Sequence, residues 1–182
     1  MNRQSISLGG IICKIRVGIA LFAGLAVWAA AGEAGGREFV AFSPTYPAGT
    51  IIIKQSERRL YFTMGAGSAV RYPIAIGRAG EAWQGETFVE GKFVSPAWSA
   101  PWAVLRDHPE LSRVIPGGSP RNPMGAAAIT LNLSEVAIHG TTVNMRKSVG
   151  TAASYGCIRM YNEDVMDLFH RVGVGTPVVA IP

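Results

Sequence analysis

The chain has 182 residues, which is enough for one domain of ordinary size and a short targeting segment. A hydrophobic content of 48% with 16% charged residues excludes a disordered chain. The 22 glycines and 11 prolines argue against a polytopic membrane protein and favour many short strands joined by turns.

The formal net charge of +5 comes largely from the N-terminal segment. Without Arg3, Lys14 and Arg16, 14 basic residues face 12 acidic ones, which leaves +2. Nucleic-acid binding would require a clustered basic face, so nucleic acid is not expected as a partner.

Residues 1–31 have the pattern of an export signal. Three basic residues precede an uncharged run over 17–31, which is shorter than the ~20 residues that span a bilayer. The run ends in alanines at 29–31, which offer a cleavage site of the A-x-A type. We interpret this segment as a secretory signal peptide. The alternative is an uncleaved membrane anchor, because Ile11 and Ile12 extend the apolar stretch. In both cases the remaining chain is expected outside the cytoplasm, in the periplasm or cell-wall space.

Residues 32–49 are expected to form a poorly structured lead-in, followed by a folded domain over residues 50–182. Short apolar runs rich in β-branched residues predict strands. These runs lie at 51–53, 60–62, 70–76, 126–131, 136–138 and 178–181. Residues 77–125 lack clear periodicity and are expected to form an irregular segment, such as a binding loop or lid.

One helix is expected late in the chain. Asn162 is a suitable N-cap, Glu163 and Asp164 suit the first turn, and Gly173 suits the end. Apolar residues follow at helical spacing. These are Val165, Leu168, Phe169 and Val172. The expected fold class is therefore mostly β with one main helix.

Cysteine usage raises a question of function. Of the two cysteines, Cys13 lies in the targeting segment, so the mature chain would keep only Cys157 and could form no internal disulfide. An unpaired cysteine in an oxidising compartment is a liability. Cys157 is therefore an inert buried thiol, an intermolecular bridge or a reactive group.

The surroundings of Cys157 favour the reactive alternative. Arg159 and exposed backbone N–H groups would favour the thiolate, and Gly156 allows the close backbone approach of an oxyanion hole. Of three histidines, His139 at the end of an apolar strand is the best general acid/base, because a strand end holds its position. The other two are expected to be structural or solvated; they are His108 and His170.

Two segments of this chain resemble the signature of the L,D-transpeptidase catalytic domain, the YkuD-type domain. They are Ile138-His139-Gly140-Thr141-Thr142 and Ser154-Tyr155-Gly156-Cys157-Ile158-Arg159-Met160, with 18 residues from the histidine to the cysteine. Weaker matches to the family lie at 51–61, 72–77, 115–118, 122–125 and 175–178. The resemblance covers about residues 50–182. It implies a β-sandwich or mixed sheet with one main helix after the cysteine.

The resemblance also implies a chemistry and a partner. Cys157 would be the nucleophile that forms a thioester with a peptidoglycan stem peptide, His139 would move the protons, and Gly156 would supply a backbone oxyanion donor. An amine acceptor gives a transpeptidase, which would cross-link or modify the cell wall. Water as acceptor gives an L,D-carboxypeptidase, and the sequence does not separate the two. A non-catalytic wall-binding module with an inert thiol is the other alternative.

Four further residues are expected to contact substrate or support the loop. Arg159 would hold a substrate carboxylate or brace the loop, with an ion pair to Asp164 as the structural alternative. Ser154, Tyr155 and Trp98 would line the groove or, for Ser154, hydrogen-bond within the loop. No metal or other cofactor is expected, because ligand spacing and a phosphate-binding loop are both missing from the sequence.

The chain departs from the family pattern at two places. Many members have histidine where Tyr155 stands, so a second imidazole in the loop is replaced by a phenol. Many members carry a Thr-Pro-x-Gly turn where this chain has residues 83–87, Trp-Gln-Gly-Glu-Thr. The second departure puts the local loop geometry in question.

Overall fold

The computed structural model describes residue 1, residues 36–43 and residues 45–182. The chain divides into the units Met1–Ala31 and Gly32–Pro182, and every element below belongs to the second. The predicted signal peptide with its cleavage site, and Cys13, lie outside the described residues. Within the described part of the chain, no helix is both long enough and apolar enough to cross a membrane.

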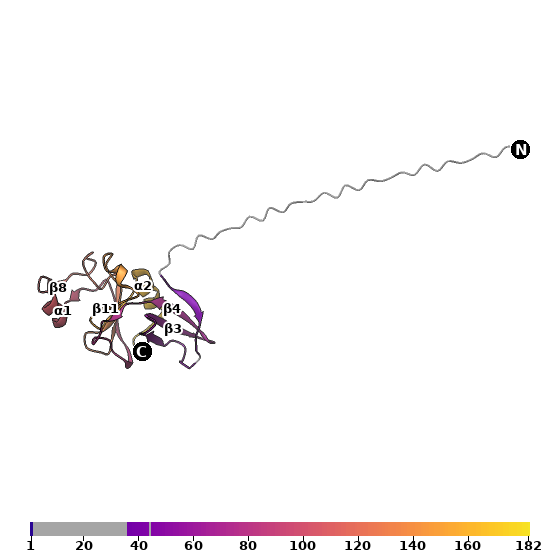
Figure 1. Cartoon of the computed structure of the whole chain (residues 1–182), viewed down its shortest axis with the longest axis horizontal. Coiled ribbons are helices and arrows are strands. Elements are labelled where there is room, and N and C mark those ends of the chain that lie inside the picture. The colour runs from indigo at the N-terminus through magenta and orange to yellow at the C-terminus, as the bar shows by residue number, and fades with distance from the viewer. Residues whose placement is uncertain (2–35, 44) are drawn as a thin grey trace. The chain divides into compact units, whose positions relative to one another are not determined.

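The folded unit is mostly β, as predicted, and contains a nine-stranded mixed sheet (Figure 1). In spatial order its strands are β1 (Glu38–Ala41), β4 (Ser68–Pro73), β3 (Arg59–Gly65), β2 (Ile51–Lys54), β13 (Pro177–Ile181), β6 (Gly85–Val94), β9 (Ala127–Leu131), β10 (Ala137–His139) and β12 (Ile158–Arg159). Two small sheets pair β5 (Ile76–Gly77) with β11 (Ala152–Ser154) and β7 (Trp98–Ser99) with β8 (Val114–Ile115). The helices are α1 (Trp102–Asp107), α2 (Asn162–Arg171) and the 3₁₀ turn η1 (Arg146–Ser148).

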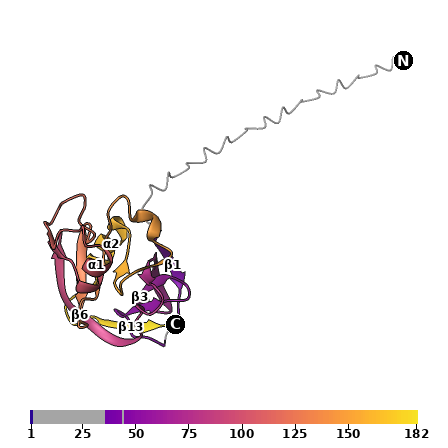
Figure 2. The ribbon, with the colours of Figure 1, turned by 60° about the vertical axis from the view of Figure 1, so that its left-hand side comes forward.

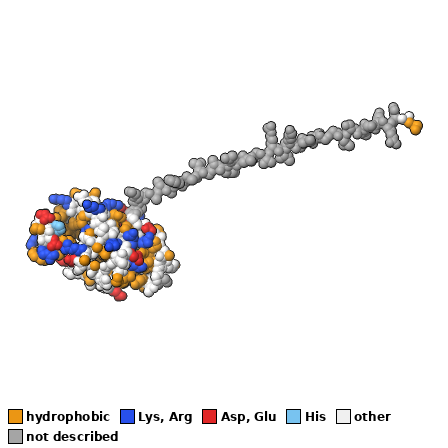
Figure 3. All heavy atoms as spheres, in the orientation of Figure 1, with side chains coloured by type: hydrophobic (Ala, Val, Ile, Leu, Met, Phe, Trp, Pro, Cys, Tyr) orange, Lys and Arg blue, Asp and Glu red, His pale blue; other side chains and the backbone are white. Residues whose placement is uncertain are grey.

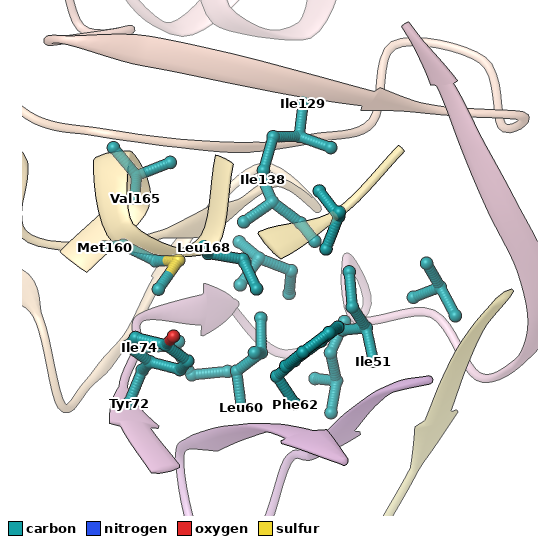
Figure 4. Close-up of a cluster of buried hydrophobic side chains, with 14 of the residues drawn as sticks. Ile51, Leu60, Phe62, Tyr72, Ile74, Ile129, Ile138, Met160, Val165 and Leu168 are labelled. Atoms are coloured by element: carbon teal, nitrogen blue, oxygen red, sulfur yellow. The ribbon is translucent and has the colours of Figure 1, made fainter. Parts of the chain in front are cut away.

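The main hydrophobic core joins the two halves of the large sheet to α2. Ile51 and Leu60 come from one half, Ile129 and Ile138 from the other, and Leu168 from α2 (Figure 4). All five are fully buried. Burying one such side chain is worth about 1.5–3 kcal/mol, so this cluster fixes β10 firmly against the helix that follows the cysteine.

The described residues of the expected lead-in, 36–43 and 45–49, are part of the fold, which corrects the prediction of a poorly structured segment there. β1 pairs antiparallel with β4, and Val40 and Phe42 pack with Tyr46 over a second buried cluster. This cluster contains Ile52, whose neighbours in sequence face the main core. The apolar run at 51–53 is therefore buried on both faces because the lead-in covers one of them.

The expectation of an irregular segment over 77–125 is wrong for β6, the longest described strand. Its first residues pair with β13, and the rest pair with β9 beyond a bulge between Val89 and Gly91. β6 thereby runs from one half of the large sheet to the other (Figure 2). The bulge breaks the two-residue alternation that marks a strand in sequence.

The strand expected over 70–76 divides into β4 and β5. β4 ends at Pro73, and the chain then crosses to the segment that carries Cys157. Pro73 lacks the N–H that would continue a ladder, which accounts for the division.

Helix α2 begins and ends close to the predicted residues, but its N-cap differs. Asn162 is the first helical residue, Tyr161 occupies the cap position, and no side chain caps the helix. The helix ends at Arg171, with Val172 rather than Gly173 at the C-cap. The Asn162 side chain instead holds two loops of the candidate site.

Charged side chains of both signs are interspersed on the face drawn in Figure 3. The folded unit also carries surface ion pairs, such as Arg71 with Glu38 and Arg146 with Glu163. A face with interspersed charges favours solubility and does not attract a polyanion such as nucleic acid.

Candidate active site

A cleft of about 660 Å³ brings together all seven predicted site residues. Cys157 and His139 line it, together with Gly156, Arg159 and Trp98. Ser154 and Tyr155 also line it. Strands β10 and β12 lie side by side in parallel with His139 opposite Arg159, so these two side chains project from the same face.

The backbone on both sides of Cys157 is fixed by residues 75–78. Ala75 and Arg159 exchange two backbone hydrogen bonds of 2.8 and 3.0 Å, which hold β12. The Arg78 N–H donates to the Ser154 carbonyl at 2.9 Å, which holds the end of β11. Residues 155–157 therefore form a short loop between two anchored ends. We call this segment the cysteine loop.

Gly156 adopts a backbone conformation that favours glycine. Its φ is +110°, and an added Cβ would lie 3.3 Å from the Glu81 carbonyl oxygen. Its N–H donates to the Ser154 hydroxyl at 3.2 Å, and that hydroxyl donates to the Cys157 carbonyl at 2.5 Å. The Gly156 N–H is thus engaged within the loop. The Cys157 N–H has no hydrogen-bond acceptor among the described residues, so it is the better oxyanion donor.

Cys157 is a free, half-buried thiol. It donates a hydrogen bond to the Glu135 carbonyl at 3.4 Å, and no hydrogen bond joins it to His139 within the described residues. Burial raises the pKa of Cys157 above its ordinary value, and the Ala137 N–H and the positive charge of Arg159 oppose this only in part. A raised pKa favours a neutral thiol at rest, whereas the sequence pattern alone led us to expect that Arg159 and the backbone N–H groups favour the thiolate.

His139 is a buried, neutral imidazole. Burial lowers its pKa to about 4, the charge of Arg159 adds to this, and the carbonyls of Gly140 and Pro123 oppose it. Its Nδ1 lies 2.7 Å from the Gly140 carbonyl oxygen. Because a carbonyl can only accept, we assign the proton to Nδ1, which leaves Nε2 able to take a proton.

Asn162 fixes the strand end that carries His139. Its Oδ1 accepts from the N–H groups of Thr141 at 2.9 Å and Ala126 at 3.0 Å, and its Nδ2 donates to the Thr141 carbonyl at 3.0 Å. A Cβ on Gly140 would lie 2.2 Å from this Oδ1, so the contact needs glycine. The His-Gly pair of the sequence motif is explained by this close approach.

Arg159 is a buried cation without a carboxylate partner in the described part of the chain. Its Nη1 donates to the Ser148 hydroxyl at 2.7 Å, and its Nε has no partner among residues 36–43 and 45–182. Burial lowers its pKa below the ordinary value. The ion pair with Asp164 considered from the sequence is not formed, because Asp164 accepts instead from the Gly36 N–H and from Arg37.

Tyr155 connects the cysteine loop to α1. Its hydroxyl donates to Asp107 at 2.9 Å, and the Arg78 guanidinium lies 3.9 Å from the centre of its ring. Arg78 also donates to Asp107 at 2.9 Å. α1 and β8 lie together at one end of the folded unit (Figure 1), and Pro101, Ala103 and Val104 line the cleft. We call α1 with its Asp107 contacts the outer wall of the cleft.

Comparison with known proteins identifies the domain. The family model described as the L,D-transpeptidase catalytic domain (YkuD) matches residues 48–179, well over half of the chain. This chain belongs to the YkuD family. The probable L,D-transpeptidase YbiS of Escherichia coli K12 is 39% identical over 140 residues, covering 70% of this chain and 43% of YbiS. The chain therefore spans less than half the length of YbiS.

Solved structures share the fold. L,D-transpeptidase 3 of Mycobacterium tuberculosis has a TM-score of 0.57 at 15% identity, covering 73% of this chain and 60% of that one. A Brucella melitensis protein, described as a probable carnitine operon oxidoreductase, has a TM-score of 0.53 at 36% identity. That similarity covers 80% of this chain and 92% of the Brucella chain. Family membership rests on the family model and the curated relatives.

The remaining histidines lie apart from Cys157 or at the edge of the YkuD-domain cleft. His108 lines the cleft, is half exposed and lies 3.5 Å from Glu110. His170 packs edge-on against Phe169 on α2. Among the described residues, no group of three or more His, Cys, Asp or Glu is placed to hold a metal ion.

Sequence reasoning missed several residues that shape this YkuD-domain site. They are Trp83, Asp107, Glu135 and Ser148, which contact Gly156, Tyr155, Cys157 and Arg159 respectively. Each lies 11 to 73 residues from its partner. No local spacing pattern connects residues so far apart, so only the departure noted at residues 83–87 carried a signal.

Proposed function

We propose that this chain is a peptidoglycan L,D-transpeptidase with Cys157 as its nucleophile. The observation that carries the proposal is that a free thiol, in the loop directly before β12, and a neutral imidazole, at the end of the adjacent strand β10, line the same cleft of a YkuD domain. A cysteine and a histidine in such a cleft can perform acyl transfer through a thioester.

The reaction would proceed in two steps. The Cys157 sulfur attacks the carbonyl carbon of the bond before a terminal D-residue, and its proton passes to His139. The tetrahedral oxyanion is held by the Cys157 N–H, the C–N bond breaks, and His139 gives the proton to the leaving amine. An amine of a second stem peptide then attacks the thioester. It gives its proton to His139 as the C–S bond breaks, and that proton returns to the thiol.

The neutral resting state suits this sequence. A thiol of raised pKa and an imidazole of lowered pKa form no stable ion pair in the empty cleft, so proton transfer accompanies attack on the substrate. Before substrate binds, the thiol donates a hydrogen bond to the Glu135 carbonyl.

Arg159 is proposed to recognise a carboxylate of the stem peptide. A buried cation without a counter-ion costs several kcal/mol, and a substrate carboxylate in the cleft would supply the missing charge. Trp98 is proposed to form part of the substrate wall. Ser154 and Tyr155 act through the loop, since their hydroxyl groups are engaged by the Cys157 carbonyl and by Asp107.

The test uses purified protein and a disaccharide tetrapeptide. We expect an acyl-enzyme on Cys157 by intact mass, release of the terminal D-residue and a cross-linked dimer, all lost in Cys157→Ala. Release without a cross-link would make the enzyme an L,D-carboxypeptidase. A folded wild-type protein that forms no adduct with the tetrapeptide or a carbapenem would contradict catalysis and leave the wall-binding module.

Export through residues 1–31 is part of the proposal and is supported by the sequence pattern alone. We expect the mature protein in the periplasm or cell-wall space, beginning near residue 32. The N-terminal sequence of protein recovered from that compartment tests this, and an intact residue 1 there would indicate an uncleaved anchor.

A further inference from the structure

Trp83 contacts the cysteine loop from a distant part of the chain. Its indole N–H donates to the Gly156 carbonyl at 3.2 Å, across 73 positions in sequence. The same residue begins the segment 83–87, where this chain departs from the turn common in its family. The contact therefore lies in a segment that departs from the family pattern and yet reaches the loop that carries the nucleophile.

The peptide between Gly156 and Cys157 is the one that matters for an oxyanion. In a trans peptide the carbonyl and the following N–H point in opposite directions. A Gly156 carbonyl directed at Trp83 therefore directs the Cys157 N–H away from Trp83. The Gly156 N–H is engaged by Ser154, so the Cys157 N–H is the donor that the loop leaves free.

This peptide would be easily reoriented without a partner. Gly156 has no side chain to restrict its dihedral angles, and it already lies at a φ of +110°. Rotation of the peptide would turn a carbonyl oxygen, in place of an N–H, toward the developing negative charge. A hydrogen bond on the carbonyl side opposes that rotation.

Trp83 itself is firmly held. It packs against the main hydrophobic core, and its own carbonyl accepts a hydrogen bond from the side chain of Gln55. Gln55 is buried and follows directly after β2, and its N–H donates to the Ile181 carbonyl at 3.0 Å. The large sheet, Gln55, Trp83 and the Gly156 carbonyl thus form one continuous support.

We propose that Trp83 is a positioning residue that orients the Cys157 N–H as the oxyanion donor. The inference rests on the proposed acyl-transfer function. Trp83 lines the cleft, and in this role its indole N–H acts through the Gly156–Cys157 peptide. The indole N–H performs this role, and the ring fills space against the core.

Two reactions of the same thiol separate this role from packing. Acylation by a carbapenem or a stem tetrapeptide passes through an oxyanion, whereas alkylation by iodoacetamide does not. We expect Trp83→Phe to lower the acylation rate about ten- to a hundredfold. This is no more than the rate loss that follows removal of an oxyanion donor itself. We expect its alkylation rate to stay within about twofold of wild type.

The control is Phe88→Leu, which removes an aromatic ring from an exposed side chain of β6 that does not line the cleft; both of its rates should equal those of wild type. If Trp83→Phe does not fold, β-(3-benzothienyl)alanine at position 83 keeps the shape and removes only the N–H. Equal losses in both reactions, or no loss in acylation, would overturn the inference. A wild-type protein that is alkylated but never acylated would instead overturn the proposed function, and this inference with it.

Discussion

The two sides of the cleft are held by different kinds of interaction. The floor, formed by β10, β12 and the cysteine loop, rests on buried residues and on backbone hydrogen bonds from residues 75–78. The outer wall, formed by α1, has no buried residue in its helix. It is held to the floor by exposed hydrogen bonds of Asp107 with Arg78 and Tyr155.

This difference gives the two sides of the cleft different roles: the floor is rigid, and the outer wall controls access to the cleft. Buried backbone hydrogen bonds are costly to break, which suits groups that must hold an oxyanion and a proton acceptor in place. Exposed ion pairs contribute little and weaken with salt, which suits a wall that has to admit the proposed substrate. Changes in the floor should therefore alter the chemical step, and changes in the wall should alter binding.

The largest effect is expected from Gly156→Ala in the floor. A φ of +110° is strained for alanine, and its Cβ would press on the Glu81 carbonyl. We expect the acylation rate to fall about a hundredfold or more as the oxyanion peptide shifts, with a loss of about 1–3 kcal/mol in stability. Stopped-flow acylation and chemical unfolding measure the two.

Gly150→Ala is the matched control for this change. Gly150 has a φ of +93°, open space around its Cβ position and no place in the cleft lining. It should lose similar stability yet acylate within a few-fold of wild type. Equal losses of acylation rate in Gly156→Ala and Gly150→Ala would show that backbone strain anywhere near the loop is enough to slow acylation. The special role of the floor in the chemical step would then be contradicted.

The second prediction concerns pH and the floor histidine. His139 is neutral when folded because its pKa is lowered to about 4 from an ordinary 6.5. Its contribution to stability is therefore full above pH 6.5 and is lost as pH falls toward 4, on the order of 3 kcal/mol. The free energy of unfolding of wild type minus that of His139→Gln should show this slope.

The comparison has to use the difference in free energy of unfolding between wild type and His139→Gln, because Asp164 titrates in the same pH range. Burial raises its pKa to about 6, so its contribution has the opposite sign: it is full at low pH and is lost as pH rises through 6. Asp164 is unchanged in both proteins and cancels. A flat difference from pH 7 to 4 would mean that His139 is not held neutral by burial.

The third prediction concerns Arg159, the buried cation of the floor. Arg159→Gln should leave stability unchanged or raise it, because it removes an unpaired buried charge. It should raise KM for a carboxylate-bearing stem peptide about tenfold or more, since a hydrogen bond to a charged group is worth about 1.5–3 kcal/mol. Isothermal titration with the tetrapeptide and its carboxamide measures the carboxylate dependence.

The matched control is Arg146→Gln, which removes an exposed ion pair with Glu163 outside the cleft. It should change neither the stability nor KM much. If wild type binds the tetrapeptide and its carboxamide equally, Arg159 is only a brace on Ser148. The floor would then bind its substrate without an interaction between Arg159 and a substrate carboxylate.

The sequence predicted the floor far better than the outer wall. Short β-branched runs located β2, β9, β10 and β13, because these strands are buried and regular. The 18-residue spacing from His139 to Cys157 brought both residues to one cleft. A local sequence pattern can predict a site when its main residues lie on one strand and one loop, as His139 and Cys157 do.

Elements without a buried face could not be predicted in this way. α1 buries no side chain, and β6 buries only Val89 and carries a bulge, so neither has an apolar period. The contacts of Trp83 and Asp107 with the cysteine loop depend on tertiary packing across long sequence separations. Asn162 was expected to cap α2 because asparagine favours caps, but its amide is used by two loops instead.

The smallest effect is expected from Asp107→Asn in the outer wall. Loss of the carboxylate weakens its bonds to Arg78 and Tyr155 and releases α1 from the cysteine loop. We expect KM to rise about two- to fivefold and ligand to dissociate faster, with the acylation rate at saturating substrate little changed. Because exposed pairs are screened, added salt should raise KM in wild type and have less effect in Asp107→Asn. Glu110→Gln, a similar change beside the half-exposed His108, controls for loss of surface charge. A fall in the saturated acylation rate of Asp107→Asn, with KM unchanged, would place the wall in the chemical step and remove the distinction from the floor.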